Sequence, residues 1–173
     1  MTARKVLFLD IDGVLHRGIA RRSGDRVVSS APEFIELFEY APLLDELLCP
    51  YPDVEIVLSS DWALVLGVEY TVAAMPLSAL RDRVVGATYE GCTFNEMLWP
   101  LLSRGEQVLD YVARYSLTKW LAIDDRVDGF ESCRDRLVHC QTEVGLGDPA
   151  VIELFRQRLR QSFSEAPIHD ANE

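Results

Sequence analysis

Two carboxylates stand close together where the first apolar run of the sequence ends. Asp10 and Asp12 follow the run KVLFL, and Gly13, which allows an abrupt turn, comes directly after them. If the run is extended, the two side chains point to the same side, and neighbouring carboxylates repel each other unless a proton or a cation lies between them. Magnesium suits such a pair because it binds a few carboxylate oxygens and keeps several waters.

Two other apolar runs also end in polar residues. Ser59 and Ser60 follow VEIVL, and Asp124 and Asp125 follow WLAI. In an open parallel sheet, ligands bind at the carboxyl ends of the strands, so groups that are far apart in the sequence can converge there with Asp10. We therefore expect one site in which carboxylates hold a hard metal ion and hydroxyls bind phosphate.

Short apolar runs predict the strands that would position these groups. Strands are expected over Lys5–Asp10, Val54–Ser60 and Trp120–Asp124, and weaker ones over Arg83–Ala87 and Leu137–Cys140. Each run is too short for a typical helix, and longer segments separate them. This pattern predicts an α/β fold with a parallel sheet and crossover helices.

The segments between the apolar runs carry helix signals. One helix is expected to begin at Pro32. Pro42 is expected to break this helix before the segment Leu43–Leu48. Apolar residues at helical spacing predict two further helices, over Glu106–Tyr115 and Pro149–Phe163.

Length and composition are those of one globular domain. The chain has 173 residues, of which 49% are hydrophobic and 26% charged, and cores split only above about 250 residues. We expect a single domain over residues 1–163 and a polar tail over residues 164–173. The net charge of −11 argues against broad binding to nucleic acid or anionic membranes.

Neither a membrane segment nor a cysteine framework is expected. No apolar run approaches the roughly 20 residues of a bilayer-spanning helix. The four cysteines lack metal-finger spacing and are too few for a dense disulfide framework. These features predict a cytoplasmic protein with reduced, mostly buried thiols.

The motifs LFLDIDGVL, IVLSSDW and LAIDDR resemble the first, second and fourth motifs of the haloacid dehalogenase (HAD) superfamily of phosphohydrolases. The resemblance spans Lys5 to Cys140 and looks most like the small bacterial HAD domains grouped with nucleic-acid-repair phosphatases. IDDR is also similar to the fourth motif of deoxyribonucleotidases. The resemblance implies a three-layer Rossmann-like fold with a central parallel sheet flanked by helices.

The resemblance implies a role for each carboxylate. Asp10 would attack phosphorus and form an aspartyl-phosphate, while Asp12 would be the general acid and base. A Mg²⁺ ion would be held by Asp10, the backbone carbonyl of Asp12 and Asp125, with Asp124 as the partner of Asp125.

The same resemblance implies groups that bind the phosphoryl oxygens. Ser60 would donate a hydrogen bond to one of them, with Ser59 as the alternative because a slip of one residue exchanges the two. The third motif needs a basic residue, and Arg104, 20 residues before Asp124, is favoured over Lys119.

An arginine-rich segment follows the first motif. Residues 17–26, RGIARRSGDR, contain four arginines and one acid, and a solvated loop is the default interpretation. Because the HAD fold places a flap here, we expect residues 17–31 to form a short flap in which Arg17, Arg21 and Arg22 contact an anionic substrate. No insertion is long enough for a large cap domain.

Three neighbours of the motifs have two interpretations each. His16 is expected either to touch the substrate or to lie on the surface. Trp62 is expected to be a core residue rather than a platform for a base, and Asp61 a helix cap rather than a ligand.

We therefore expect a Mg²⁺-dependent phosphomonoester hydrolase that acts on nucleotides or on terminal phosphates of nucleic acids. A small-molecule or protein phosphatase that uses the same residues is one alternative. A non-catalytic HAD-fold binding or regulatory module is the other. The open site would also suit small phosphates held by a protein partner or a second copy of the chain.

Overall fold

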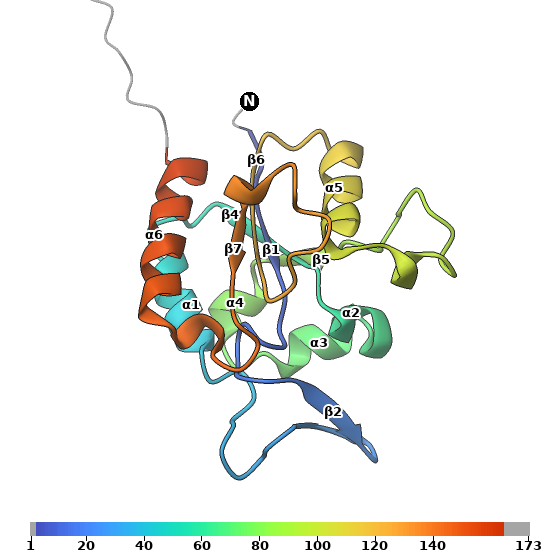
Figure 1. Cartoon of the computed structure of the whole chain (residues 1–173), viewed down its shortest axis with the longest axis vertical. Helices are drawn as coiled ribbons and strands as arrows, with labels where there is room; N and C mark the ends of the chain where they lie inside the picture. Colours follow the sequence, from blue (N-terminus) through green and yellow to red (C-terminus); the bar gives the residue numbers. More distant parts are fainter. Residues whose placement is uncertain (1–2, 165–173) are drawn as a thin grey trace, which may run out of the picture.

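In the computed structural model, which describes residues 3–164, five parallel strands form a central sheet with the order β5-β4-β1-β6-β7 (Figure 1). All four neighbouring pairs are parallel. The five predicted strands are confirmed, each within two residues of its predicted ends. The strands are β1 (Lys5–Leu9), β4 (Val54–Leu58), β5 (Val84–Ala87), β6 (Lys119–Asp124) and β7 (Leu137–His139).

Helices connect the strands in the described part of the chain. The α-helices are α1 (Ala41–Leu48), α2 (Asp61–Leu66), α3 (Val68–Ala74), α4 (Ser78–Arg81), α5 (Arg104–Arg114) and α6 (Pro149–Phe163). Short 3₁₀ turns cover Trp99–Leu101, Arg134–Arg136 and Gly145–Gly147. The predicted helices at α5 and α6 are confirmed.

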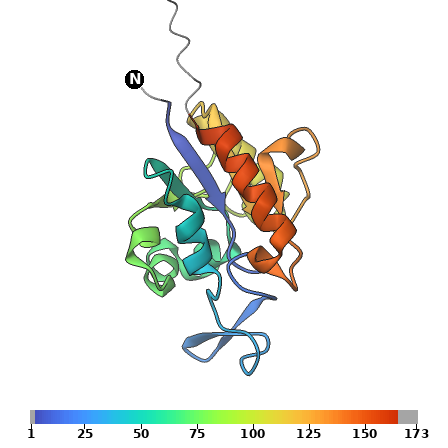
Figure 2. The ribbon, with the colours of Figure 1, turned by 90° about the vertical axis from the view of Figure 1, so that its left-hand side faces the viewer.

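The central strand shows why the fold has three layers. Every residue of β1 is buried, and successive side chains point to opposite faces of the sheet. Leu7 and Leu9 belong to the core cluster that includes residues of α1 and α6, whereas Val6 and Phe8 belong to the one that includes residues of α5. Figures 1 and 2 show these helices on opposite sides of the strands, so the predicted three-layer α/β fold is confirmed.

The segment before α1 differs from its prediction. Residues 31–40 form turns rather than a helix, and Phe34 among them is 77% exposed. The helix begins at Ala41 with Pro42 in its first turn, where the missing N–H of proline is not needed. The predicted helix from Pro32 is therefore wrong, because Pro42 begins a helix rather than ending one.

The predicted flap is a β-hairpin. Strands β2 (Ala20–Ser23) and β3 (Arg26–Ser29) pair antiparallel, and Gly24, with φ of 63°, lies in the two-residue turn between them. The hairpin projects beyond the ends of the sheet strands (Figures 1 and 2). No inserted domain accompanies it in residues 3–164, in agreement with the expectation that a large cap is absent.

The remaining expectations concern cysteines, membranes and the tail. All four cysteines are free thiols, but only Cys140 is buried and Cys49 is exposed, so the expectation of mostly buried thiols is wrong. None of the helices in the described residues combines the length and hydrophobicity that crossing a bilayer requires. Of the predicted polar tail, residues 165–173 lie outside the described residues.

Candidate active site

Three carboxylates meet at the carboxyl ends of β1 and β6. Leu9 is paired in register with Ile123, so the residues that follow, Asp10 and Asp124, lie side by side. Together with Asp125 they bring one oxygen each to within 4.8 Å of one another. Asp10 and Asp124 are almost fully buried. The expected convergence of the first and last acidic motifs is therefore present.

Gly13 allows the loops that carry these carboxylates to approach closely. Its φ is 67°, in the left-handed region that favours glycine. A Cβ at this position would lie 2.9 Å from the Cα of Thr142 and closer still to the carboxylate of Asp125. The hydroxyl of Thr142 donates a 2.7 Å hydrogen bond to Asp125 Oδ2 and fixes its orientation.

Arg104 is the cation beside the cluster. It occupies the first position of α5, which Ser103 and Glu106 cap reciprocally through side chain and backbone. Its Nη2 lies 4.0 Å from Asp10 Oδ1, and its Nε lies 3.1 Å from Asp124 Oδ2. The guanidinium is almost fully buried, so its charge acts on the carboxylates with little screening by water.

The electrostatics of the cluster indicate an excess of negative charge. Burial and the neighbouring Asp124 raise the pKa of Asp10 well above its usual value. Burial also raises the pKa of Asp124 to about 7, although Arg104 acts in the opposite direction. Burial alone would lower the pKa of Arg104, but Asp124 and Asp10 outweigh it and raise that pKa. One guanidinium therefore does not balance three carboxylates.

The cluster fits a hard divalent cation. Its donors are carboxylate oxygens, which magnesium prefers. The buried Oδ2 of Asp124 makes no hydrogen bond within residues 3–164, because its contact with Arg104 is an ion pair without hydrogen-bond geometry. Such an oxygen is available as a ligand.

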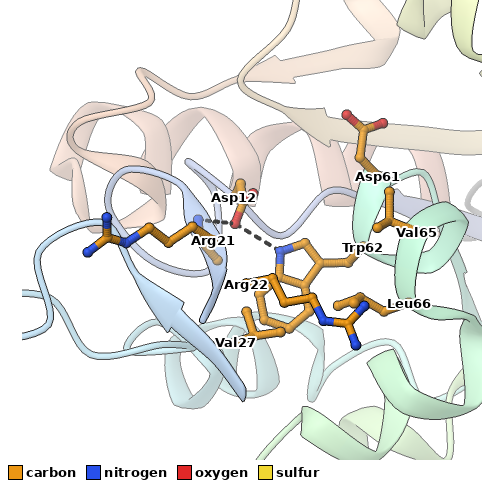
Figure 3. A pocket seen from close by; sticks show the side chains of 9 residues that line it. Asp12, Arg21, Arg22, Val27, Asp61, Trp62, Val65 and Leu66 are labelled. Carbon is orange, nitrogen blue, oxygen red and sulfur yellow. Dashed lines mark hydrogen bonds between the residues drawn. The ribbon is translucent and has the colours of Figure 1, made fainter. Parts of the chain in front are cut away.

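Asp12 lies in a different environment from Asp10. Its Oδ1 lies 3.0 Å from each of three groups, Nε2 of His16, the backbone N–H of Ala20 and Nε1 of Trp62. Figure 3 shows the bond to the indole. Because the N–H of Phe38 donates to His16 Nδ1, Nε2 is assigned as the nitrogen that carries the proton and donates to Asp12. One oxygen of Asp12 is thus held in place, while the other accepts no hydrogen bond from residues 3–164.

The two serines after β4 have different surroundings. The Oγ of Ser60 accepts a hydrogen bond from the N–H of Trp62 and caps α2. The N–H of Ser59 donates to Leu9, which continues the β1–β4 register and brings Ser59 beside Asp10. Its buried Oγ has no hydrogen-bond partner among the described residues. The hydroxyl of Ser59 is therefore available to a ligand, while the Oγ of Ser60 accepts one hydrogen bond and still has its own proton to donate.

The two predicted third-motif residues lie at opposite ends of the sheet. Lys119 is the first residue of β6 and pairs in register with Lys5, the first residue of β1. Asp124 is the last residue of the same strand. Arg104, and not Lys119, is thus the basic residue beside the carboxylates.

The three flap arginines do not share one environment. Arg17 Nε lies 2.9 Å from Glu39 Oε1, and its Nη2 donates to the carbonyl of Phe34, so its guanidinium braces the chain after the hairpin. Within residues 3–164, neither Arg21 nor Arg22 forms an ion pair, and both are exposed. These two remain available to an anion.

The comparisons with known proteins identify the family. A family model described as the HAD domain in Swiss Army Knife RNA repair proteins matches residues 6–151. The chain belongs to this family. The matched range includes the acidic cluster, Asp12, the hairpin and Arg104. Neither a curated protein nor a solved structure matches the chain.

Two residues of this HAD domain have contacts that the sequence interpretation did not anticipate. His16 is fully buried, so neither expectation for it is correct. Trp62 is a core residue as expected, but its indole N–H also reaches Asp12. Asp61 does not cap the helix as expected, because the cap of α2 is Ser60. Instead, Asp61 Oδ1 lies 3.4 Å from Arg104 Nη2. The sequence signal for the contact between Trp62 and Asp12 is the position of Trp62, the last residue of the motif IVLSSDW and close to the start of a helix.

Proposed function

We propose that this HAD domain is a Mg²⁺-dependent phosphomonoester hydrolase that forms an aspartyl-phosphate on Asp10. The observation that carries the proposal is the cluster of Asp10, Asp124 and Asp125 beside a buried Arg104. The family description, RNA repair, supports nucleotides or terminal phosphates of nucleic acids as substrates. A phosphatase of this kind needs a nucleophile, a proton donor and positive charge around the phosphoryl group.

Residues of the acidic cluster would hold the metal. Asp10 and Asp125 would supply carboxylate oxygens, Asp12 its backbone carbonyl, and Asp124 either a ligand or a contact to Asp125. When bound, Mg²⁺ supplies positive charge that offsets the negative charge of the phosphoryl group.

The two carboxylates of the first motif would divide the chemistry. Asp10 attacks phosphorus, forming the aspartyl-phosphate bond as the ester P–O bond breaks. Asp12 gives its proton to the leaving oxygen and later removes a proton from the water that attacks the aspartyl-phosphate, which releases phosphate and regenerates Asp10. Three donors hold Asp12 Oδ1, so Oδ2 is the oxygen that exchanges the proton.

Ser59 and Arg104 would bind the transferring phosphoryl group. The hydroxyl of Ser59 is buried beside Asp10 and has no partner among the described residues, which favours it over Ser60, whose Oγ already accepts a hydrogen bond from the N–H of Trp62. Arg104 is fixed between Asp10 and Asp124 before any substrate arrives. Charge placed in advance around the reacting group is the main source of catalysis in phosphoryl transfer.

Release of phosphate from p-nitrophenyl phosphate tests the proposal. The wild-type protein should require Mg²⁺, and Asp10→Asn should reduce release to the background rate because an amide is no nucleophile for phosphorus. Asp82→Asn removes an exposed carboxylate far along the chain from the motifs and is the matched control. Mg²⁺-dependent release that survives in Asp10→Asn would contradict the mechanism.

A substrate panel separates the remaining alternatives. It should contain nucleotides, 3′- and 5′-phosphorylated oligonucleotides, sugar phosphates and phosphopeptides. Preference for sugar phosphates or phosphopeptides would contradict the nucleotide assignment but not the mechanism. No turnover of any member by protein that binds Mg²⁺ would favour a non-catalytic module instead.

A further inference from the structure

A small cavity lies between the hairpin and α2, directly beside Asp12 (Figure 3). Its volume is about 160 Å³. The lining is mainly apolar apart from Asp12, Asp61 and two arginines of β2. The lining includes Asp12, Arg22, Val27, Trp62, Val65 and Leu66.

The place of Asp12 in the lining indicates what enters the cavity. If Asp12 protonates the leaving oxygen, as proposed above, the leaving group must be on the side of Asp12 when the ester bond breaks. Trp62 forms both a wall of the cavity and a hydrogen bond to Asp12. The leaving group of the substrate, and not its phosphoryl group, therefore faces this cavity.

Besides its two carboxylates, the lining has an apolar wall with the positive charge of Arg22 along it. Val65 is 72% exposed, which leaves apolar surface uncovered beside the indole of Trp62. In Figure 3 the guanidinium of Arg22 lies along the same wall near Leu66, whereas that of Arg21 points away from the indole. Arg22 forms no ion pair within residues 3–164, only a bond from its Nε to a carbonyl of the hairpin turn. The site thus offers an apolar surface for a ring and a charge for an anion next to it.

We propose that this cavity is the leaving-group subsite and takes the terminal nucleoside of a nucleotide chain. The base packs against Trp62, Val65 and Leu66, and the neighbouring phosphodiester pairs with Arg22. This proposal rests on the proposed phosphatase function and specifies its substrate. The cavity is smaller than the roughly 300–1,000 Å³ of pockets that enclose whole drug-sized ligands. It therefore suits one nucleoside, with the rest of the chain lying outside.

A nucleotide chain fits this lining better than a phosphopeptide does. Every phosphodiester of the chain stands one sugar away from a base, so an anion beside a ring is guaranteed at each terminus. A phosphopeptide would need an acidic residue at one particular position to meet Arg22. Phosphotyrosine peptides are accordingly the competing substrate in the test.

The test compares a terminally phosphorylated dinucleotide, which carries one internal phosphodiester, with p-nitrophenyl phosphate. The wild-type protein should have the higher kcat/KM for the dinucleotide. Arg22→Ala should lower the ratio of the two kcat/KM values about tenfold, mainly through KM for the dinucleotide, since a charge-assisted bond contributes about 1.4 kcal/mol. Arg26→Ala removes the same charge from the same hairpin outside the cavity and should change the ratio less than about twofold through weaker, screened interactions.

A second pair of variants tests the apolar wall. Val65→Glu adds a negative charge next to the proposed phosphodiester, and Val65→Gln is its uncharged counterpart of similar shape. The ratio of kcat/KM for the dinucleotide to kcat/KM for p-nitrophenyl phosphate should fall further for Val65→Glu than for Val65→Gln. Because Val65 is exposed on α2, neither variant should prevent folding.

Binding to the Asp10→Asn protein gives a readout that does not require turnover. Arg22→Ala in that background should raise the Kd of the dinucleotide about tenfold, as estimated above for the same charge-assisted bond. An equal effect of Arg22→Ala and Arg26→Ala, or a preference for phosphotyrosine peptide over dinucleotide, overturns the subsite and leaves the phosphatase mechanism standing. Absence of all turnover overturns the proposed function, while the binding measurements still decide the subsite.

Discussion

The start of α5 carries Arg104 to the acidic cluster, and Gly105 lets it approach. The N–H of Gly105 donates a 2.8 Å hydrogen bond to the carbonyl of Asp128, whose carboxylate accepts from the N–H of Arg104. A Cβ at position 105 would lie 2.7 Å from the Cα of Gly129 and closer still to its carbonyl group, whereas real Cβ atoms essentially never approach within 3.0 Å. Gly105→Ala must therefore push α5 and the loop after β6 apart.

The size of this shift sets the expected effect. The distance from the added Cβ to the Cα of Gly129 must grow by at least about 0.3 Å, and the distance to the carbonyl group of Gly129 by more. Overpacking of this kind costs about 1–3 kcal/mol, which lowers Tm by about 2–12 °C in a chain of this length. Because a 1 Å displacement costs about 10²-fold in rate, turnover per folded molecule should fall about tenfold or more as Arg104 moves from Asp10.

Two measurements on the same samples separate stability from positioning. Thermal unfolding gives Tm, and phosphate release from p-nitrophenyl phosphate well below Tm gives the rate per folded molecule. Gly91→Ala is the control, because its φ is 67° but its nearest neighbour would be 3.6 Å away, on a flexible arginine. It should lower Tm without lowering the rate. Full activity of Gly105→Ala at a lowered Tm would show that the position of Arg104 does not limit catalysis, and an unchanged Tm would refute the close approach itself.

Two further predictions follow from the hydrogen bonds and pKa shifts. Trp62→Phe keeps an aromatic ring, although a smaller one, and removes the N–H that holds Asp12, so kcat should fall about tenfold with little change in KM, since a bond to a charged group contributes about 1.5 kcal/mol. The remote Trp120→Phe should leave kcat unchanged, and equal rates for both variants would contradict the role of Trp62. In metal-free protein the pKa of Asp124 is raised to about 7, and the pKa of Asp10 is raised as well. The folded state therefore binds protons at these carboxylates more tightly than the unfolded state does. The stabilising contribution of Asp124 is then complete below about pH 4, and it is lost as pH rises through about 7. Mg²⁺ competes with these protons, so the increase in Tm on adding it should be larger at about pH 8 than at about pH 6, and an equal increase at both would contradict binding at this cluster.

The sheet could be predicted from the sequence because its strands are uniformly apolar. Strands buried on both faces read as short continuous apolar runs, and polar residues mark their ends. The prolines were harder to interpret. Proline suits the first turn of a helix, so either Pro32 or Pro42 could lie in one, and in the structure Pro42 is the one that does, in α1. A helix also could not continue through Phe38, where φ is 60°, in the left-handed region.

The choice between the two third-motif candidates was within reach of the sequence. In a parallel sheet the first residue of a strand lies at the amino end, and the ligand crevice lies at the carboxyl end. Lys119 directly precedes the predicted strand that ends at Asp124, so topology alone places it too far away. Arg104 begins a helix, and how closely a helix approaches depends on contacts such as that of Gly105 with Gly129, which no pattern of residue types reveals.

The surroundings of Asp12 were beyond prediction for a different reason. Its three donors come from a buried histidine four residues on, a backbone N–H of the hairpin and an indole 50 residues away. Each is an ordinary residue in the sequence, and only the tertiary structure brings them to one oxygen. The choice between Ser59 and Ser60 likewise depends on which hydroxyl caps α2, a detail of one turn of backbone.

The hydrogen bond from the N–H of Ala20 to Asp12 connects the hairpin strand β2 to the proposed proton donor. Ala20 is the first residue of β2, and Arg22 lies two residues further along the same strand. The strand that carries Arg22 is therefore anchored on the carboxylate that would protonate the leaving group. A net charge of −11 gave no hint of this arrangement, because the buried carboxylates face Arg104 while exposed arginines line the side on which a substrate would enter. The charge around a site follows from where the charged groups lie, and here two exposed arginines of the hairpin line the cavity beside Asp12.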